Sequence, residues 1–171
     1  MPDFDPSERK AFVERWVTMW DSPTAPADAM EYYTEDAVIE DKAFEHTYRG
    51  HRELHEYFSR AGELFSDIRS VSQGVVVGPS HAVAHVHYSA TLREPFLCLP
   101  ESSRGKRFSL YLMSLLEFAE DGRIARSVDA YDRAGVLQQL GVLPDSAADS
   151  AAAPTAHAAP ATPFTGTTPS G

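Results

Sequence analysis

The sequence predicts an α+β domain in which several helices pack on one face of an antiparallel β-sheet. Apolar residues recur at helical spacing in the N-terminal part of the chain, whereas most of the later segments have the pattern of strands. Helices that precede a run of strands are typical of this fold class. With 171 residues, of which 43% are hydrophobic, the chain is long enough for one domain with a substantial core.

Three segments have the spacing of amphipathic helices, namely residues 7–21, 27–36 and 51–65. Ser7 is a candidate N-cap of the first segment. The break SPTAP separates the first segment from the second. The residues that recur on the apolar faces of the first and third segments are Phe12, Trp16, Met19, Trp20, Leu54, Tyr57, Phe58, Ala61 and Leu64. We therefore expect three helices before the main group of strands.

The remaining segments of the domain have the pattern of strands. A short one, residues 37–41, lies between the second and third helices. Longer ones follow at residues 68–78, 81–94, 106–120 and 123–132. The turn Glu-Asp-Gly joins the last two as a hairpin. A long sheet that curls around helices leaves a cavity at its concave face, where we expect a binding site.

The charge of the chain disfavours two classes of function. Its net charge of −10 and pI near 5.0 disfavour binding to nucleic acid through phosphate attraction and binding to an anionic membrane surface. The sequence has no run of about 18 apolar residues and no signal-peptide pattern, so we expect a cytoplasmic protein with no nucleic-acid or membrane partner. Cys98 is the single cysteine, which excludes an intrachain disulfide, and we interpret it as a small apolar residue.

The composition of the chain changes at residue 145. Residues 145–171 are dominated by Ala, Pro, Thr and Ser and contain few charges. Such a segment cannot bury enough apolar surface to offset the entropy lost on ordering. We expect residues 1–144 to form the domain and residues 145–171 to form a disordered tail.

The last predicted strand carries two aspartates, Asp129 and Asp132, although strands disfavour this residue. Alternation places Asp129 on the same face as Tyr131 and Asp132 on the opposite face. We expect Asp132 to cap the next helix. Asp129 is the candidate catalytic residue, and its alternatives are an ion pair with Arg126 or a capping role.

A second predicted strand places His85 and His87 on one face. If the polar faces of both strands line the cavity, Asp129 lies beside a histidine, and such a pair supports general acid–base catalysis. Asp41 could supply a second carboxylate, and its alternative is a loop residue paired with a neighbouring lysine or arginine. Two carboxylates in unequal surroundings can divide the roles of acid and base. This set suits proton abstraction next to a carbonyl, dehydration or ring closure.

The spacing His-x-His also invites a metal-site interpretation. The helical first half of the chain does not suit the all-β barrels in which this spacing binds metals. The sequence also contains no glycine-rich phosphate loop, nucleophile elbow or dinucleotide-binding fingerprint. We therefore expect neither a metal nor a cofactor.

Three segments resemble the SnoaL-like group of the nuclear transport factor two-like superfamily. They are YYTEDAVIED (32–41), YRGHRELHEYF (48–58) and FAEDGRIARSVDAYDRAGVLQQLG (118–141). The resemblance spans Ser7 to Leu143 and implies a cone of helices wrapped by a curved, mostly antiparallel sheet. The superfamily includes ketosteroid isomerase, limonene epoxide hydrolase, scytalone dehydratase and polyketide cyclases, as well as non-catalytic binders.

The resemblance also implies roles for single residues. Asp41 stands where ketosteroid isomerase has its general base, and Asp129 stands where limonene epoxide hydrolase has a catalytic aspartate. The oxyanion-hole tyrosine of the isomerase and its partner aspartate fall on Trp16 and Ser114. Neither family's complete constellation is therefore present.

We expect a cofactor-independent enzyme that isomerises or cyclises a hydrophobic, polyketide-type small molecule by acid–base catalysis. Asp129 is the main acid or base, assisted by Asp41 and by His85 or His87. One alternative is epoxide opening, with the two aspartates facing each other across the pocket; another is a non-catalytic ligand-binding or dimerisation domain. The residues expected to line the pocket, some of which could equally be core, are Trp16, Tyr33, Phe44, Phe58, Ser114 and Tyr131.

The sequence also predicts self-association. Many relatives in the superfamily dimerise through the open face of the sheet. The apolar run LYLMSLL at residues 110–116 would suit such a contact. We therefore expect a homodimer.

Overall fold

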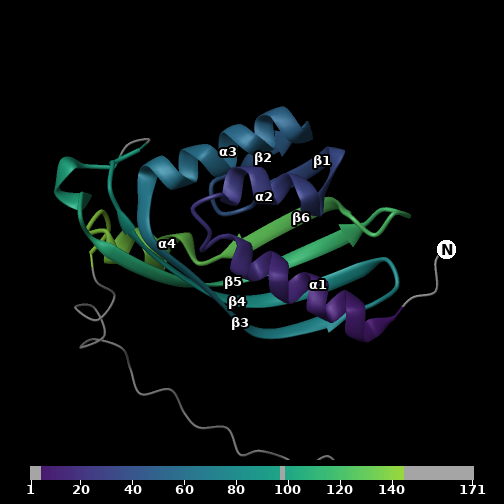
Figure 1. The fold of residues 1–171 in the computed structure, drawn as a ribbon. Coiled ribbons are helices and arrows are strands. Elements are labelled where there is room, and N and C mark those ends of the chain that lie inside the picture. The colour runs from purple at the N-terminus through teal and green to yellow at the C-terminus, as the bar shows by residue number, and fades with distance from the viewer. Residues whose placement is uncertain (1–4, 97–98, 145–171) are drawn as a thin grey trace, which may run out of the picture.

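The computed structural model describes residues 5–96 and 99–144, and Figure 1 shows how the helices and strands are arranged. The predicted tail, residues 145–171, and Cys98 lie outside the described residues. In chain order the elements are α1 (Pro6–Met19), α2 (Ala25–Tyr32), β1 (Tyr33–Asp41), β2 (His46–Arg49), α3 (Gly50–Leu64), β3 (Phe65–Val77), β4 (His81–Leu92), the 3-10 helix η1 (Glu101–Ser103), β5 (Arg107–Phe118), β6 (Ile124–Tyr131) and α4 (Arg133–Gln139).

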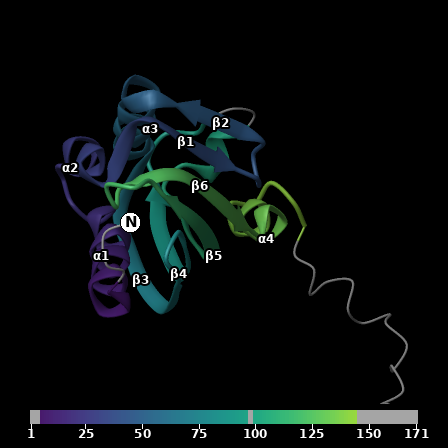
Figure 2. The same ribbon diagram turned by 90° about the vertical axis from the view of Figure 1, so that its right-hand side faces the viewer.

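The strands of the described chain form one six-stranded sheet in the order β2-β1-β6-β5-β4-β3. Neighbouring strands run antiparallel except β1 and β6, which run parallel. Helices α1, α2 and α3 lie on one side of the sheet, which curves around them, as Figures 1 and 2 show. The predicted α+β class, with helices packed in a curved and mostly antiparallel sheet, is confirmed.

The main core lies between these helices and the concave face of the sheet. Buried residues of α1 and α3 meet buried residues of β1, β4, β5 and β6 there. Burial of one such aliphatic or aromatic side chain stabilises the fold by roughly 1.5–3 kcal/mol relative to exposure. The side chains with almost no exposed surface include Val13, Val17, Ile39, Leu54 and Leu116.

A smaller core cluster lies where α4 packs on β5. Val136 and Leu140 pack there with Phe108 of β5. Helix α4 begins directly after β6 because Asp132 caps it, with its Oδ1 accepting a hydrogen bond from the backbone N–H of Gly135 at 3.0 Å. The predicted capping role of Asp132 is confirmed.

Three local predictions differ from the structure. Asp5, and not Ser7, caps α1, because the Asp5 carboxylate accepts a hydrogen bond from the Ser7 N–H at 2.7 Å. Strand β1 begins at Tyr33, inside the segment predicted to be the second helix, in keeping with the strand preference of tyrosine and threonine. Strand β2 has four residues, too few for a recognisable alternation. Gly50, with φ of 70°, makes the turn from β2 into α3.

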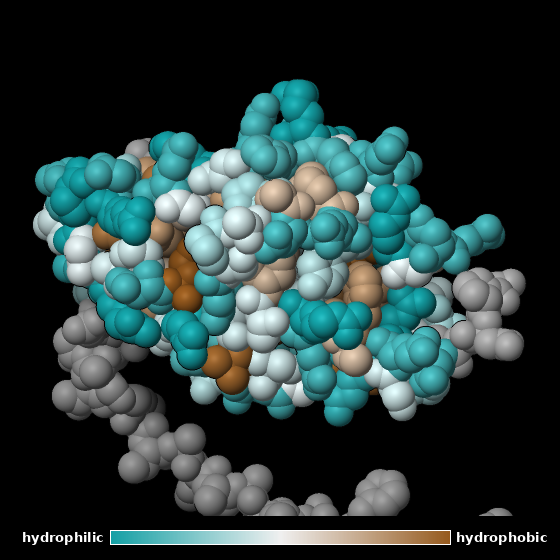
Figure 3. Space-filling model, in the orientation of Figure 1, coloured by the Kyte–Doolittle hydropathy of each residue, from teal (hydrophilic) through white to brown (hydrophobic). Residues whose placement is uncertain are grey.

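The two faces of the molecule differ in polarity. Figure 3 shows the face that carries α1 and α3, which is mostly hydrophilic with hydrophobic residues in small separate patches. On the opposite, convex face of the sheet, exposed apolar side chains gather on β3 and β5. We call this set the outer patch; its members are Val71, Val76, Tyr111, Met113 and Leu115. No helix among the described residues is long and apolar enough to span a bilayer.

Candidate active site

Two aspartates lie side by side on the concave face, on the parallel strands β1 and β6. Asp41 is the register partner of Asp129, and the backbone N–H of Lys42 donates a hydrogen bond to the carbonyl oxygen of Asp129 at 2.9 Å. Because residues paired in register point to the same face of a sheet, both carboxylates enter the same cavity. The epoxide-opening alternative supposed that the two aspartates face each other across the pocket. They are instead neighbours on one wall of it.

Asp129 is buried, with 8% of its surface exposed. Its Oδ1 accepts a hydrogen bond from the hydroxyl of Ser114 on β5 at 2.6 Å. Burial raises the pKa of Asp129 to about 6; the Ser114 hydrogen bond opposes this rise, and the negative charge of Asp41 adds to it. A carboxylate with this pKa can exchange protons close to neutral pH.

Three donors hold the carboxylate of Asp41. Its Oδ1 accepts hydrogen bonds from the backbone N–H groups of Ala43 at 2.9 Å and Phe44 at 3.0 Å. Its Oδ2 accepts a hydrogen bond from the Tyr131 hydroxyl at 2.9 Å. The two neighbouring aspartates therefore have unequal surroundings, one desolvated and one held by several donors.

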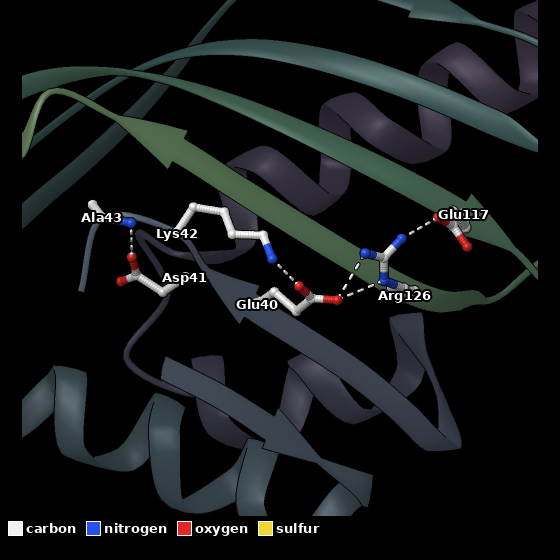
Figure 4. A network of polar contacts seen from close by, with 6 residues as sticks. All are labelled: Glu40, Asp41, Lys42, Ala43, Glu117 and Arg126. Carbon is white, nitrogen blue, oxygen red and sulfur yellow. Dashed lines mark hydrogen bonds and ion pairs between the residues drawn. The ribbon is translucent and has the colours of Figure 1, made fainter. Parts of the chain in front are cut away.

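Neither aspartate forms the ion pair that was its alternative role. Arg126 and Lys42 both pair with Glu40, whose side chain lies on the other face of the sheet. Figure 4 shows this network, with the Asp41 carboxylate outside it and bonded to the backbone of the following turn. In the part of the chain that the structure describes, no lysine, arginine or histidine forms a salt bridge with Asp41 or Asp129.

The cavity around the two carboxylates has a volume of about 950 Å³, a size that suits a small organic molecule. Much of its wall is aromatic or aliphatic, and examples are Phe65, Phe96, Phe108, Leu110, Leu137 and Leu140. Exposed charged residues of α3, such as Arg52, Glu56 and Arg60, also border it, so the cavity opens to solvent along this helix.

The structure brings some predicted pocket residues together and separates others. Trp16, Phe44 and Tyr131 line the cavity with the two aspartates. Tyr33 and Phe58 are not among the lining residues, because they pack in the main core behind its wall. Their expected place in the pocket is therefore wrong.

The two positions that match the oxyanion hole are engaged within the protein. The indole N–H of Trp16 donates a hydrogen bond to the Tyr33 hydroxyl at 3.1 Å. Ser114 is fully buried, and its hydroxyl donates a hydrogen bond to Asp129. Each of these side chains has a single N–H or O–H donor, so neither has a proton left for a substrate.

The expected pairing of Asp129 with His85 or His87 is wrong. Strand β4 turns Val86 into the cavity, and the two histidines point to the convex face of the sheet. Their rings lie 5.5 Å and 5.0 Å from the ring of Tyr111, measured between centroids. Helices cover the concave face, so the apolar residues of β4, such as Ala84 and Val86, lie on that face. Within residues 5–96 and 99–144, no group of three or more His, Cys, Asp or Glu side chains could hold a metal ion.

Sequence reasoning missed three tyrosines that line the cavity, namely Tyr48, Tyr57 and Tyr88. Tyr48 lies on β2, which was not predicted. Tyr57 was counted with the apolar face of α3, and Tyr88 alternates with the two histidines on β4 and so belongs to the opposite face. The available signal was chemical, because a tyrosine on a buried face carries a hydroxyl that requires a hydrogen-bond partner.

Solved structures share this fold. TsrD from Streptomyces laurentii has a TM-score of 0.70 at 24% identity, and the match covers 82% of this chain and 100% of that one. A proposed SnoaL-like polyketide cyclase from Jannaschia sp. CCS1 has a TM-score of 0.70 at 17% identity, covering 84% and 100%. A protein with a ketosteroid isomerase-like fold from Catenulispora acidiphila, in complex with trimethylamine, has a TM-score of 0.65 at 17% identity, covering 77% and 93%. At these identities the likeness establishes the fold alone.

The family is established by the sequence itself. No curated protein matches the chain. The family model described as a SnoaL-like domain matches residues 13–127, from α1 into β6 and therefore across most of the described fold. The chain thus belongs to the SnoaL-like domain family, as its sequence resemblance predicted.

Proposed function

We propose that the chain is a cofactor-independent acid–base enzyme that isomerises or cyclises a hydrophobic, polyketide-type small molecule. One observation carries this proposal: two carboxylates in unequal surroundings lie side by side in a largely apolar cavity. Asp129 is desolvated and has a pKa of about 6, whereas three donors hold Asp41. Pairs of this kind are suited to proton transfer near neutral pH.

Asp129 is the main acid or base. Above a pH of about 6 its carboxylate is ionised and takes a proton from a carbon next to a carbonyl group. The electron pair of the C–H bond moves to the carbonyl oxygen and forms an enolate. If the enolate is conjugated with a C=C bond, return of the proton from Asp129 to the far carbon of that system completes an isomerisation. Attack of the enolate carbon on a second carbonyl of the same molecule closes a ring, and the proton on Asp129 passes to the new alkoxide oxygen. Neither path changes the oxidation state of the substrate.

Asp41 assists in two ways. Its negative charge contributes to the raised pKa of Asp129, which makes Asp129 a stronger base than an exposed aspartate. Its two backbone donors and the Tyr131 hydroxyl hold its carboxylate in one orientation, where it can accept a hydrogen bond from a substrate hydroxyl.

The lining of the cavity supports the substrate class. A poly-β-ketone chain combines acidic C–H groups with a skeleton that an aromatic and aliphatic wall can bind. Similar folds belong to proposed polyketide cyclases from Jannaschia sp. CCS1 and from Xanthomonas campestris, and this likeness supports the same class.

Deuterium exchange in hydrophobic ketones tests the proposal. A panel of aryl ketones, including 2-acetylnaphthalene, is incubated with the protein in D₂O, and deuterium gain next to the carbonyl is followed by mass spectrometry. We expect the wild type to accelerate exchange and Asp129→Asn to lose about 100-fold or more of that acceleration. Asp132→Asn is the matched control, since asparagine retains the helix cap on the opposite face of the strand.

Two results would contradict the proposed function. One is a correctly folded Asp129→Asn variant that exchanges protons at the wild-type rate. The other is a wild-type protein that accelerates exchange in no ketone of the panel.

A further inference from the structure

An enolate formed in this cavity requires a hydrogen-bond donor at its oxygen. Ionised carboxylates accept hydrogen bonds and cannot donate one. The Trp16 N–H donates a hydrogen bond to Tyr33, and the Ser114 hydroxyl donates one to Asp129. The Tyr131 hydroxyl donates one to Asp41. The donor must therefore be a group that the sequence comparison did not indicate.

Tyr57 projects from α3 into the cavity. Its ring lies between that of Tyr48, at 4.4 Å between centroids, and that of Trp20, at 5.7 Å in an edge-on contact. These contacts fix the direction of the phenol. Among the residues that the structure describes, its hydroxyl has no hydrogen-bond partner, in contrast to the hydroxyls of Tyr48 and Tyr131.

The charges of both carboxylates act on the Tyr57 hydroxyl. Burial raises the pKa of Tyr57 well above its usual value, and the negative charges of Asp129 and then Asp41 raise it further. The phenol therefore stays protonated throughout the physiological pH range and acts as a donor. The same surroundings that make Asp129 a competent base keep Tyr57 un-ionised.

Two further hydroxyls of the cavity wall, those of Ser70 and Tyr88, lie at a different place. Within the described part of the chain the Ser70 hydroxyl is buried without a hydrogen-bond partner, and the Ser70 backbone N–H donates a hydrogen bond to the Asp21 carboxylate at 2.6 Å. Tyr88 is the cross-strand partner of Ser70, and after burial it is the charge of Asp21, not that of Asp129, which raises its pKa. These groups form a second polar cluster near Asp21, whereas Tyr57 shares its part of the cavity with the two catalytic carboxylates.

We propose that Tyr57 is a catalytic residue that donates a hydrogen bond to the substrate's carbonyl oxygen and stabilises the enolate. This inference rests on the proposed acid–base function and deepens it. As Asp129 removes the proton from carbon, the electron pair moves to oxygen, and the Tyr57 O–H shortens its hydrogen bond without giving up its proton. When carbon is reprotonated or attacks a second carbonyl, the oxygen becomes a carbonyl oxygen again. Tyr57 carries the same proton throughout.

The infrared band of a bound ketone tests this assignment. 2-Acetylnaphthalene labelled with ¹³C at the carbonyl is bound to the wild type, to Tyr57→Phe and to Tyr32→Phe. Tyr32 is the matched control, since it packs on Phe12 and does not line the cavity. A hydrogen bond lowers the carbonyl stretching frequency, so we expect the band to move to higher wavenumber in Tyr57→Phe and to stay in place in Tyr32→Phe.

Kinetics of deuterium exchange give the second arm of the test. Loss of one donor to a developing oxyanion lowers kcat by about 100-fold, whereas loss of one neutral hydrogen bond weakens ground-state binding by about tenfold or less. We therefore expect Tyr57→Phe to reduce kcat far more than it raises KM. In wild-type protein with ¹³Cζ-labelled tyrosine, ketone binding should shift the Tyr57 resonance and leave that of Tyr32 unchanged.

The outcomes separate this assignment from the proposed function. An unchanged carbonyl band in Tyr57→Phe, or an unmoved Tyr57 resonance, overturns the assignment even where Asp129-dependent exchange persists. A band shift in a wild-type protein that catalyses no exchange keeps Tyr57 as the donor and removes the acid–base function. A wild type that binds no ketone overturns both.

Discussion

Acidic residues on the two faces of the sheet have opposite surroundings. On the convex face, Glu40 and Glu117 share Arg126 in a partly exposed network. On the concave face, Asp41 and Asp129 have no cationic partner among the described residues, and Asp129 is buried. Glu40 and Asp41 are neighbours in sequence, so one step of strand alternation separates the two environments. Surface ion pairs contribute little stability, whereas a buried unpaired carboxylate costs stability and points to function.

The apolar residues of the sheet show the reverse contrast. The concave face buries its aliphatic side chains under the helices, while the outer patch exposes large ones, including Val76 at 73% and Tyr111 at 62%. A convex face with such a patch is suited to contact with another protein surface. The sheet therefore separates the cavity that holds the two carboxylates from an exposed apolar surface.

The largest effect is expected where an aromatic residue assigned to the core is removed. Phe58→Ala should lower the free energy of unfolding by about 3–5 kcal/mol, because Phe58 is almost fully buried between α3 and the sheet. Tyr111→Ala, a truncation of similar size on the outer patch, should change the monomer's stability by about 0.5 kcal/mol or less. Urea unfolding of both variants, at protein concentrations low enough to keep the chain monomeric, measures the difference. Equal losses would remove the contrast between the two faces.

Asp129→Asn should stabilise the protein at neutral pH while it abolishes activity. The folded pKa of about 6 lies above the unfolded value of about 3.9. Below a pH of about 4 the carboxyl is protonated in both states, and the native protein loses stability as the pH rises through 6 because it must carry a desolvated charge. The variant lacks this loss, so its advantage should grow by up to about 3 kcal/mol between pH 4 and 8.

Denaturant unfolding at several pH values checks this gain. Asp132→Asn, which alters a helix cap at the end of the same strand, should show no such growth with pH. An advantage of Asp129→Asn that stays constant from pH 4 to 8 would show that the carboxylate has no desolvation cost in the native state.

We propose that a second copy of the chain covers the outer patch. The patch carries no charged side chain, so a twofold-related copy can approach it without charge repulsion. Tyr111→Glu should weaken self-association by about ten- to a hundredfold, because it replaces an apolar contact with a charge. His55→Glu, on the exposed face of α3, is the control. Light scattering measures the mass, and a wild type that is monomeric at high concentration would contradict the proposal.

The smallest effect is expected in the charged network of the convex face. Arg126→Gln removes both ion pairs that Arg126 forms with Glu40 and Glu117. Because all three side chains are partly exposed, the free energy of unfolding should fall by less than about 1 kcal/mol. Added salt should reduce this difference further. A loss as large as that of Phe58→Ala would show that the network is a principal support of the sheet.

The sequence was informative where the relevant physics is local. Strand alternation separated Asp129 from Asp132, and the capping preference of aspartate placed Asp132 at the start of α4. It did not settle which face of β4 is inside, because a catalytic cavity can be lined by the apolar face or by the face that carries the histidines. The choice depends on how the helices pack over Val86. Because Val86 faces the cavity, His85 and His87 lie on the convex face.

Distance along the chain explains the remaining omissions. Tyr57 shares a cavity with the two aspartates because α3 packs over β1, and no local pattern records this long-range arrangement. Phe58 shares the apolar face of the same helix with Tyr57, yet Tyr57 turns to the cavity while Phe58 stays in the core. A difference of one residue on a helix decides between the two, and only tertiary packing reveals it.

The most direct test is a titration of the Asp129 carboxyl group. In protein labelled with ¹³C at the aspartate side-chain carboxyls, the Asp129 resonance is assigned by its absence from Asp129→Asn and followed against pH. We expect a pKa of about 6, and a higher one in Ser114→Ala, since the Ser114 hydroxyl stabilises the ionised form. A wild-type titration near 3.9, the value of an exposed aspartate, would contradict a buried acid–base carboxylate in this cavity.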